Sequence, residues 1–314
     1  MVKKKENIVK EKKEKILSNS RSDKIFDITN ILIMAVLLFI FVWPLWFVVV
    51  ASFSDPYEVW KGNVLIWLKG FTLKGYKELF KYDPIWIGYR NTIFYTALGT
   101  VINMVMTVLC AYPLSRKDWG PRRFWLKYCM ITMYISGGLI PTYLVIKNLR
   151  MTNTIWVMMI PCALSFYNAL IVRNYFMNSI PGELQEASEL DGANPMQYLI
   201  KVVIPLSKPV LAVVCLYYAV SHWNDYYTAL VYISGRNLIP LQTALREVLM
   251  SSSSIADLLH NTDANTAMQM QQRQELAMSL KYTSIIAGII PMMIIYPFIQ
   301  KYFVKGVMIG AIKG

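Results

Sequence analysis

The stretch SIPGELQEASELDGANPMQYLIKVVIPLSKP, residues 179–209, is a polar segment that turns twice between two strongly apolar ones. Pro181 suits the first turn of a short helix, where a backbone N–H has no partner within the helix. Gly192, after Asp191, suits the left-handed end of that helix, where a side chain would clash. The first half of the stretch therefore predicts a short helix closed by a glycine turn, a shape typical of a docking surface on a membrane protein.

The second half of the stretch predicts a new helix and its end. Asn194 suits the N-cap, Pro195 suits the first helical position, and Gln197 is spaced to reach back as in a capping box. Pro205 and Pro209 are predicted to end that helix and to allow the next one to begin.

The side chains of the first short helix suit contact with a partner. Ala187 and Ser188 are small enough to let another surface come close, and Glu183, Glu186 and Glu189 would offer it negative charge. An ordinary amphipathic surface hairpin is the alternative interpretation of the same pattern.

The composition independently indicates a membrane protein. The chain is 55% hydrophobic with a mean hydropathy of +0.38, whereas soluble domains are about half apolar even with glycine counted. A helix needs about 20 mostly apolar residues to cross a bilayer. We therefore predict an all-α membrane protein with six transmembrane helices, near residues 28–51, 89–114, 124–146, 154–172, 210–233 and 276–298. Polar residues interrupt the second, fourth and fifth spans and leave their boundaries open: Asn91, Asn103, Asn168, Asn224 and Asp225.

The placement of lysine and arginine predicts that both termini lie in the cytoplasm. With the N-terminus inside, the inner segments hold twenty of the 32 Lys and Arg residues. One outer segment weakens this bias because it contains five lysines: Lys61, Lys69, Lys74, Lys77 and Lys81. By this interpretation residues 1–27 form a basic cytoplasmic tail, and residues 28–314 form the transmembrane domain.

The net charge of +13 does not predict a nucleic-acid partner. The lysines of the tail alternate with Glu6, Glu11 and Glu14, and no aromatic residues stand among them for base stacking. Contact with anionic lipid headgroups and simple solubility of the tail are both compatible with its charge.

Residues that usually carry catalysis or bind metals form no recognisable pattern in this chain. The four cysteines fall inside predicted spans without CxxC spacing, which indicates small packing residues: Cys110, Cys129, Cys162 and Cys215. The two histidines, His222 and His260, lie far apart in the sequence. No zinc-protease, nucleophile-elbow or Walker A sequence is present. We therefore predict no metal site, no cofactor bound by this chain and no enzymatic activity.

One spaced motif in residues 179–209 resembles that of a known family. It has an acidic and two small residues, then a glycine, then two aliphatic residues before a proline: Glu186, Ala187, Ser188, Gly192, Val202, Ile204 and Pro205. This pattern resembles the EAA loop, by which permease subunits of ABC importers hold their ATPase. Ser188 stands where alanine is usual, and Val202 and Ile204 replace the usual isoleucine and leucine. The resemblance implies that Glu186, Ala187, Ser188, Gly192 and Pro205 couple this chain to an ATPase.

Other segments resemble the second permease of maltose-type carbohydrate importers. FIQKYFVKG at 298–306 with GAIKG at 310–314 resembles the end of that permease, and WNDY at 223–226 resembles its Trp-Asn-acidic-aromatic element. SGGLIPTY at 136–143 and PLQTALR at 240–246 are similar to the branch linked to oligosaccharide or polysaccharide uptake, including aldouronate-type permeases.

The resemblance runs from about residue 28 to residue 314 and implies a type I ABC importer permease in the bacterial cytoplasmic membrane. It implies a second homologous permease, a dimer of ATP-binding subunits that carries ATP and Mg, an extracellular solute-binding protein and a carbohydrate substrate. This chain would supply half of the sugar path. Import of a non-sugar nutrient is the alternative function, whereas a membrane enzyme acting alone would leave the EAA-like loop unexplained.

Aromatic and amide side chains are the candidates for the sugar path, because sugars need flat apolar faces and planar hydrogen-bonding groups. They lie on the fourth and fifth predicted spans: Trp156, Tyr167, Asn168, Tyr218, His222, Trp223, Asn224, Asp225 and Tyr226. An ionisable residue inside a span, such as Asp225, is by default a functional hypothesis. The alternative is that Asn224 and Asp225 satisfy neighbouring backbone or arginine groups and hold the helices in register.

Residues 234–275 are predicted to form an extracellular loop that touches the solute-binding protein. The segment is far longer than the roughly 2–8 residues that usually connect neighbouring helices. Its long hydrogen-bonding side chains Gln269, Gln271 and Gln272 suit entry into a sugar cleft. A solvated loop without a partner is the alternative.

Overall fold

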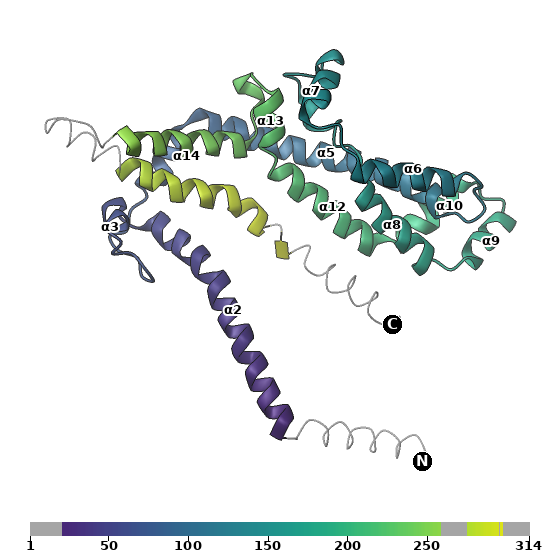
Figure 1. Cartoon of the computed structure of the whole chain (residues 1–314), viewed down its shortest axis with the longest axis horizontal. Coiled ribbons are helices and arrows are strands. Elements are labelled where there is room, and N and C mark those ends of the chain that lie inside the picture. The colour runs from purple at the N-terminus through teal and green to yellow at the C-terminus, as the bar shows by residue number, and fades with distance from the viewer. Residues whose placement is uncertain (1–20, 259–274, 295, 298–314) are drawn as a thin grey trace. The chain divides into compact units, whose positions relative to one another are not determined.

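The computed structural model describes residues 21–258, 275–294 and 296–297. Most of the basic tail, the three candidate glutamines Gln269, Gln271 and Gln272, and the motif at 298–314 lie outside the described residues. The chain divides into two units, residues 1–73 and 74–314. The described residues form helices and loops, which confirms the all-α prediction for that part of the chain (Figure 1).

The described residues of the first unit form one long helix and a short one. Helix α2 (Arg21–Phe53) includes the first predicted span, and α3 (Pro56–Trp60) follows it. Asp55 caps α3 by accepting a hydrogen bond from the backbone N–H of Tyr57 at 2.9 Å, and Pro56 occupies the first helical turn. The indole N–H of Trp46 donates to the Ile66 carbonyl at 2.9 Å, which ties the loop after α3 to α2.

The second unit is built around α5 (Asp83–Ser115), which packs against α8, α12 and α14. In chain order its other elements are α4 (Lys74–Lys81), α6 (Arg122–Tyr134), α7 (Leu139–Asn148), η1 (Ile155–Met158), α8 (Phe166–Ser179), α9 (Glu183–Leu190), α10 (Pro195–Tyr198), η2 (Leu199–Val203), α11 (Ile204–Leu206), α12 (Lys208–Trp223), α13 (Tyr227–Tyr232), η3 (Arg236–Leu238) and α14 (Leu241–Leu258). A further helix covers Glu275–Ile294.

Among the described residues, hydrophobic clusters lie near both ends of α5. Near its C-terminal end, Val108 and Tyr112 pack with residues of α8 and α12 and with the helical segment between α9 and α12. Near its N-terminal end, Ile85 packs with Trp223 and with the first turns of α14. The fold therefore places the stretch 179–209 at one end of α5 and α14 at the other.

Three described helices are long and apolar enough to cross a membrane: Asp23–Phe53, Asp83–Ser115 and Glu275–Ile294. They correspond to the first, second and sixth predicted spans. Two bent pairs could each supply one more, so the described residues contain up to five spans rather than six. In the first bent pair, α6 and α7 meet at 113° across the non-helical residues 135–138, where Gly138 has a left-handed φ of +80°.

The fourth predicted span, residues 154–172, is interrupted and does not form one continuous helix. The chain forms the one-turn 3₁₀ helix η1, then turns through residues 159–165, and becomes α-helical only at Phe166. Pro161 lies in this turn and lacks the backbone N–H that a continuous helix would require. The fifth span is also interrupted, because α12 ends at Trp223 and α13 starts at Tyr227.

The predicted helix boundary between Pro205 and Pro209 is confirmed, because one helical piece ends at Leu206 and α12 begins at Lys208, but Pro205 itself does not end the helix. Residues 195–206 stay helical, and a π-helical turn, η2, immediately precedes Ile204 and Pro205. A π turn shifts the hydrogen-bond pattern by one residue, which accommodates a proline that can donate no bond to the preceding turn. The sharp break comes instead at Ser207, before Pro209, where the two helical pieces meet at 84°.

The segment 234–275 is not a loop throughout, because residues 241–258 form the 18-residue helix α14. Leu241, Ala244, Leu245 and Val248 are all buried at helical spacing, so this part of the segment has an apolar face that packs into the second unit. The run of serines that follows in the sequence obscured that spacing. Whether the segment lies outside the cell stays a prediction.

Candidate functional site

Within residues 179–209, α9 and the turn that follows it are exposed, and the turn and the next cap have the local geometry that the sequence predicts. Gly192 has a φ of +76°, which confirms the left-handed turn after α9. Asn194 and Gln197 form the predicted capping box, with hydrogen bonds of 2.8 and 2.9 Å. On α9, Glu186 and Ala187 are exposed, and Leu190 at the tip is 89% exposed. Ser188 is half-buried, and its hydroxyl donates to the Gln185 carbonyl within the same helix at 2.8 Å.

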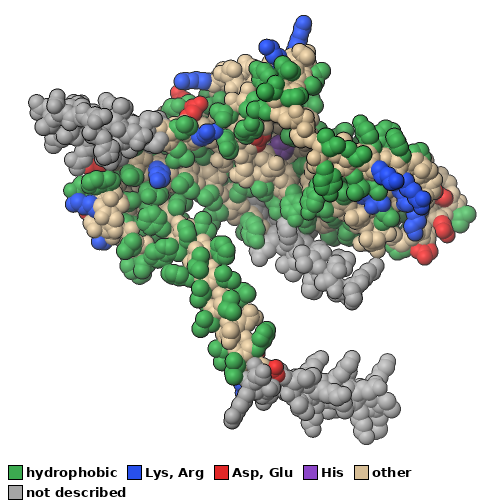
Figure 2. Space-filling model, viewed as in Figure 1, with side chains coloured by type: hydrophobic (Ala, Val, Ile, Leu, Met, Phe, Trp, Pro, Cys, Tyr) green, Lys and Arg blue, Asp and Glu red, His purple; other side chains and the backbone are tan. Residues whose placement is uncertain are grey.

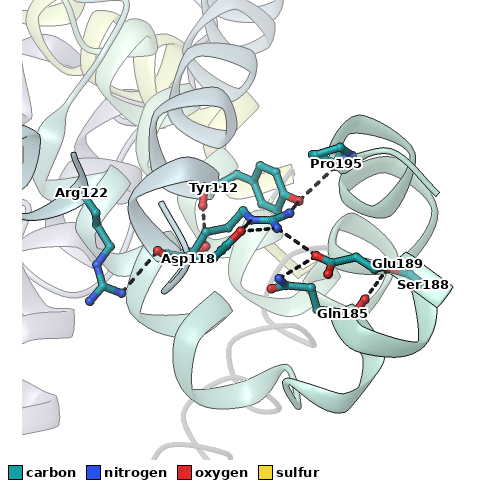
Figure 3. A network of polar contacts seen from close by, with 9 residues as sticks. Tyr112, Asp118, Arg122, Gln185, Ser188, Glu189 and Pro195 are labelled. Atoms are coloured by element: carbon teal, nitrogen blue, oxygen red, sulfur yellow. Dashed lines mark hydrogen bonds and ion pairs between the residues drawn. The ribbon is translucent and has the colours of Figure 1, made fainter. Parts of the chain in front are cut away.

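One arginine links this helix and turn to the end of α5. The Arg116 guanidinium pairs with Asp118 at 2.6 Å and with Glu189 at 3.0 Å. Figure 3 shows Tyr112, Asp118 and Glu189 in this network of polar contacts. Arg116 also donates to the hydroxyl of Tyr112 at 3.0 Å, and that hydroxyl donates to the Pro195 carbonyl at 3.0 Å. Arg116 therefore holds α9 directly and the start of α10 through Tyr112.

The electrostatics of this link favour its charged form. The hydrogen bonds from Arg116 lower the pKa of the Asp118 carboxyl, and the same contact raises the pKa of Arg116. The Arg116 side chain is only 13% exposed, whereas its two acidic partners are each 55% exposed. The sequence predicts Arg116 only as one of several cytoplasmic charges, because nothing in the local pattern connects it to a glutamate 73 residues away.

A hollow of about 280 Å³ lies under α9, between this helix and the end of α5. It is lined by Tyr112, Arg116, Ile180, Gln185 and Glu186, among others. Figure 2 shows lysine and arginine side chains gathered over α6, next to acidic side chains near α9. This end of the second unit therefore combines an exposed helix, a hollow beside Glu186 and charges of both signs, which suits a protein partner.

The interrupted spans meet near the middle of α5, around Asn103. The Asn103 amide N–H donates to the carbonyl of Cys162 in the turn of residues 159–165. Its side-chain oxygen lies 2.6 Å from Nε2 of His222, at the end of α12. Because the amide oxygen can only accept, Nε2 of His222 carries the proton in this arrangement. Asn103 thus joins α5 to two of the breaks.

A second hydrogen-bonded pair supports the same turn. The hydroxyl of Tyr218 on α12 lies 2.7 Å from that of Thr107 on α5 and accepts the backbone N–H of Ser165 at 3.1 Å. Gly99 makes room for the ring of His222, since a Cβ there would lie 2.6 Å from Nε2. Non-helical backbone at membrane depth is tolerated where it is buried in protein or lines a watery cavity. Pro161 and Cys162 are exposed in this chain, so the turn is a candidate lining of a path.

The nine candidate path residues divide by exposure. Four are buried, with 4–7% of each residue exposed: Asn168, Tyr218, His222 and Trp223. Trp156, Tyr167, Asn224 and Tyr226 are exposed, and Asp225 is partly buried. The indole N–H of Trp223 donates to the Gly288 carbonyl at 3.0 Å, so its ring holds the last described helix instead of offering a face to a ligand.

Asn224 and Asp225 bond to neighbouring backbone, in line with the structural alternative. The Asn224 amide donates to the Val220 carbonyl, and Asp225 accepts the backbone N–H of Thr228, each at 3.0 Å. Asp225 therefore bonds to the first turn of α13 after the break. Within the described residues, no three His, Cys, Asp or Glu side chains gather in a metal-binding arrangement.

Comparison with known proteins identifies the family. No protein-family model matches the chain. The chain is 34% identical over 298 residues to Protein LplC of Bacillus subtilis (strain 168), covering 95% of this chain and 98% of the relative. It is 33% identical over 292 residues to the polygalacturonan/rhamnogalacturonan transport system permease protein YtcP of the same organism, covering 93% and 99%.

A solved structure agrees with these relatives. The chain resembles one chain of a bacterial ABC transporter involved in the import of the acidic polysaccharide alginate, with a TM-score of 0.80 and 33% identity. The similarity covers 90% of this chain and 98% of that chain. The protein belongs to the carbohydrate ABC transporter permeases, which are membrane transport subunits rather than enzymes.

Proposed function

We propose that this chain forms half of the path of an ATP-driven oligosaccharide importer in the bacterial cytoplasmic membrane, with six spans and both termini inside. Its partners would be a second homologous permease, two ATP-binding subunits that carry ATP and Mg, and an external solute-binding protein. The observation that carries the proposal is the exposed helix α9 and its Gly192 turn, bound through Arg116 to the end of the long apolar helix α5. Such an arrangement can transmit movement of a docked ATPase to the spans.

Within this proposal the residues have separate roles. Glu186 and Ala187 would contact the ATPase, and Gly192 would shape the turn on this chain that meets it. Ser188 and Pro205 would keep the helical elements in place, Ser188 through its hydrogen bond to Gln185 and Pro205 through the π turn before it. The accessible residues of the breaks would face the sugar: Trp156, Tyr167, Asn224, Asp225 and Tyr226. We leave the buried Asn168, Tyr218, His222 and Trp223 out of direct sugar contact and assign them to holding the breaks. The glutamines Gln269, Gln271 and Gln272 remain proposed contacts of the binding protein.

The cargo can be tested by uptake in cells that lack this gene. One relative, the sn-glycerol-3-phosphate transport system permease protein UgpE of Salmonella typhi, is 28% identical over 239 residues, so a non-sugar cargo belongs in the comparison. We expect restored uptake of labelled oligosaccharides when the wild-type gene is returned. Restored uptake of sn-glycerol-3-phosphate without any oligosaccharide would contradict the proposal.

The role of the turn can be tested by Gly192→Val. Nothing lies within 4 Å of a Cβ at this position, so the substitution acts through the left-handed φ and not through a clash. A left-handed residue with a side chain costs roughly 1–2 kcal/mol, and we expect the altered turn to reduce ATPase co-purification and sugar uptake severalfold while membrane insertion persists. Gly182→Ala is the matched control, because Gly182 has φ −62° and equally open space. Full ATPase association and uptake in Gly192→Val would refute the coupling role.

A further inference from the structure

A groove of about 550 Å³ lies between α12, α14 and the helix Glu275–Ile294. Ligand pockets typically have volumes of about 300–1,000 Å³ and are mostly apolar with a few placed polar groups. This groove fits that description: its walls are largely apolar, and the polar side chains that line it include Asn224, Gln242 and Ser284. The Ser284 hydroxyl is buried and has no hydrogen-bond partner among the described residues. A buried hydroxyl without a partner is costly unless a ligand or water completes it.

One face of α14 contributes both to the groove and to its edge. Positions 242, 245, 246 and 249 share a helical face by their spacing, and three of them line the groove: Gln242, Leu245 and Leu249. The fourth, Arg246, places its guanidinium 5.0 Å from the ring centroid of Tyr226, at the break after α12. The groove therefore has a positively charged edge beside Asn224 and Tyr226.

Arg246 has a free hydrogen-bonding fork in the described part of the chain. It stacks on Tyr226 but forms no ion pair among the described residues. Asp225, the charged residue of the break after α12, uses one carboxylate oxygen to accept the backbone N–H of Thr228. Stacking on an aromatic ring fixes the guanidinium plane while its N–H groups stay available, and this planar fork matches a carboxylate in two parallel hydrogen bonds.

We propose that this groove is a sugar subsite and that Arg246 selects cargo carrying uronate carboxylates. This inference rests on the proposed function and adds the class of sugar. The apolar walls would pack on the C–H face of a sugar ring, while Gln242, Asn224 and Ser284 bind its hydroxyls and Arg246 binds the C6 carboxylate. The names of two similar proteins agree with acidic cargo, one being a polygalacturonan/rhamnogalacturonan permease and the other an importer of the acidic polysaccharide alginate.

The test compares acidic and neutral cargo in the complete importer, reconstituted with its partner permease, ATPase and binding protein. The probes are labelled trimers of galacturonate, mannuronate and guluronate, and the corresponding trimers in which each carboxylate is a CH₂OH group. At low probe concentration we expect Arg246→Gln to slow uptake of an acidic trimer by about tenfold or more, with neutral uptake unchanged. Arg246→Lys should retain an intermediate rate, because it keeps the charge but not the fork.

The control variant is Arg150→Gln, which removes the same charge from an exposed arginine between α7 and η1 that does not line the groove. Equal loss of acidic and neutral uptake in Arg246→Gln would make Arg246 a structural residue and overturn the proposal. Unchanged uptake of acidic and neutral trimers by Arg246→Gln would also overturn the proposal. The groove would then be assigned to a lipid chain or to a helix of the partner permease. Wild-type transport of neutral trimers alone would refute the uronate assignment but not the importer function, whereas transport of no trimer by the intact importer would count against both.

Discussion

Arg116 is the residue whose role depends most on contacts distant in sequence. It pairs with Asp118, two residues away, and with Glu189, 73 residues away, and it orients Tyr112 toward Pro195. Exposed ion pairs are worth at most about 1 kcal/mol each, so this group matters for position more than for stability. It is a positioning residue for α9, since it joins the surface proposed to meet the ATPase to the helix proposed to cross the membrane.

We expect Arg116→Gln to lower the number of sugars transported per ATP hydrolysed severalfold, because α9 can then move without moving α5. Assembly of the importer should persist. Lys117→Gln is the matched control, because it removes the same charge from the adjacent exposed residue. Combining Arg116→Gln with Glu189→Gln should add little further loss, as for two residues that act through one contact. An unchanged transport-to-hydrolysis ratio, or fully additive losses, would rule out this positioning role.

At the scale of elements, the helix breaks are held by buried polar contacts. The turn of residues 159–165 is bonded to α5 through Asn103 and to α12 through Tyr218, and the end of α12 is bonded to Asn103 through His222. Gly99 is necessary for this packing because the imidazole ring occupies the space of a side chain. The breaks are therefore fixed features of the second unit and not frayed helix ends.

Replacing Gly99 by alanine should displace the His222 ring and separate it from Asn103. Overpacking of this kind costs about 1–3 kcal/mol, even though alanine is the better helix former. We expect a lower unfolding temperature of the purified importer and slower sugar uptake. Gly120→Ala is the control, because nothing lies within 4 Å of its Cβ. Equal unfolding temperatures for the two variants would show that the helices relax around the added methyl group.

At the scale of the whole molecule, apolar helices and polar connections alternate along the chain. Helix α2 of the first unit exposes a long apolar surface, and α5 of the second unit is 33 residues long, about 50 Å at 1.5 Å per residue. Helices α2 and α5 are therefore both longer than the roughly 30 Å thickness of the hydrocarbon layer of a membrane. The distribution of lysine and arginine then predicts which connections face the cytoplasm.

Cysteine labelling tests that orientation. In a functional variant with Cys110, Cys129, Cys162 and Cys215 replaced by alanine, we expect Lys69→Cys to react with a membrane-impermeant maleimide in intact cells. Leu190→Cys should react only after the membrane is opened, because α9 is predicted to face the cytoplasm. Both introduced residues replace exposed side chains, so slow reaction cannot be attributed to burial. Labelling of Leu190→Cys in intact cells would reverse the predicted topology.

The sequence by itself determined the features that depend on neighbouring residues or on summed composition. The Gly192 turn and the Asn194–Gln197 capping box involve atoms a few residues apart, so their residue types suffice to predict them. The apolar character of α2 and α5 follows from length and composition alone. The spaced residues of 179–209 and the end of the chain also indicated the family that the comparisons established.

The tertiary structure decided which polar residues meet and which aromatic residues are buried. His222 and Asn103 are 119 residues apart, and their contact depends on how α12 packs on α5. The burial of Trp223 likewise depends on the helices packed around it. The position of the sharp bend at Ser207 depends on the π turn before Pro205. Composition can show that a segment is apolar enough to cross a membrane, but it cannot show which face will pack, because that face is chosen by shape and hydrogen bonding with distant parts of the chain.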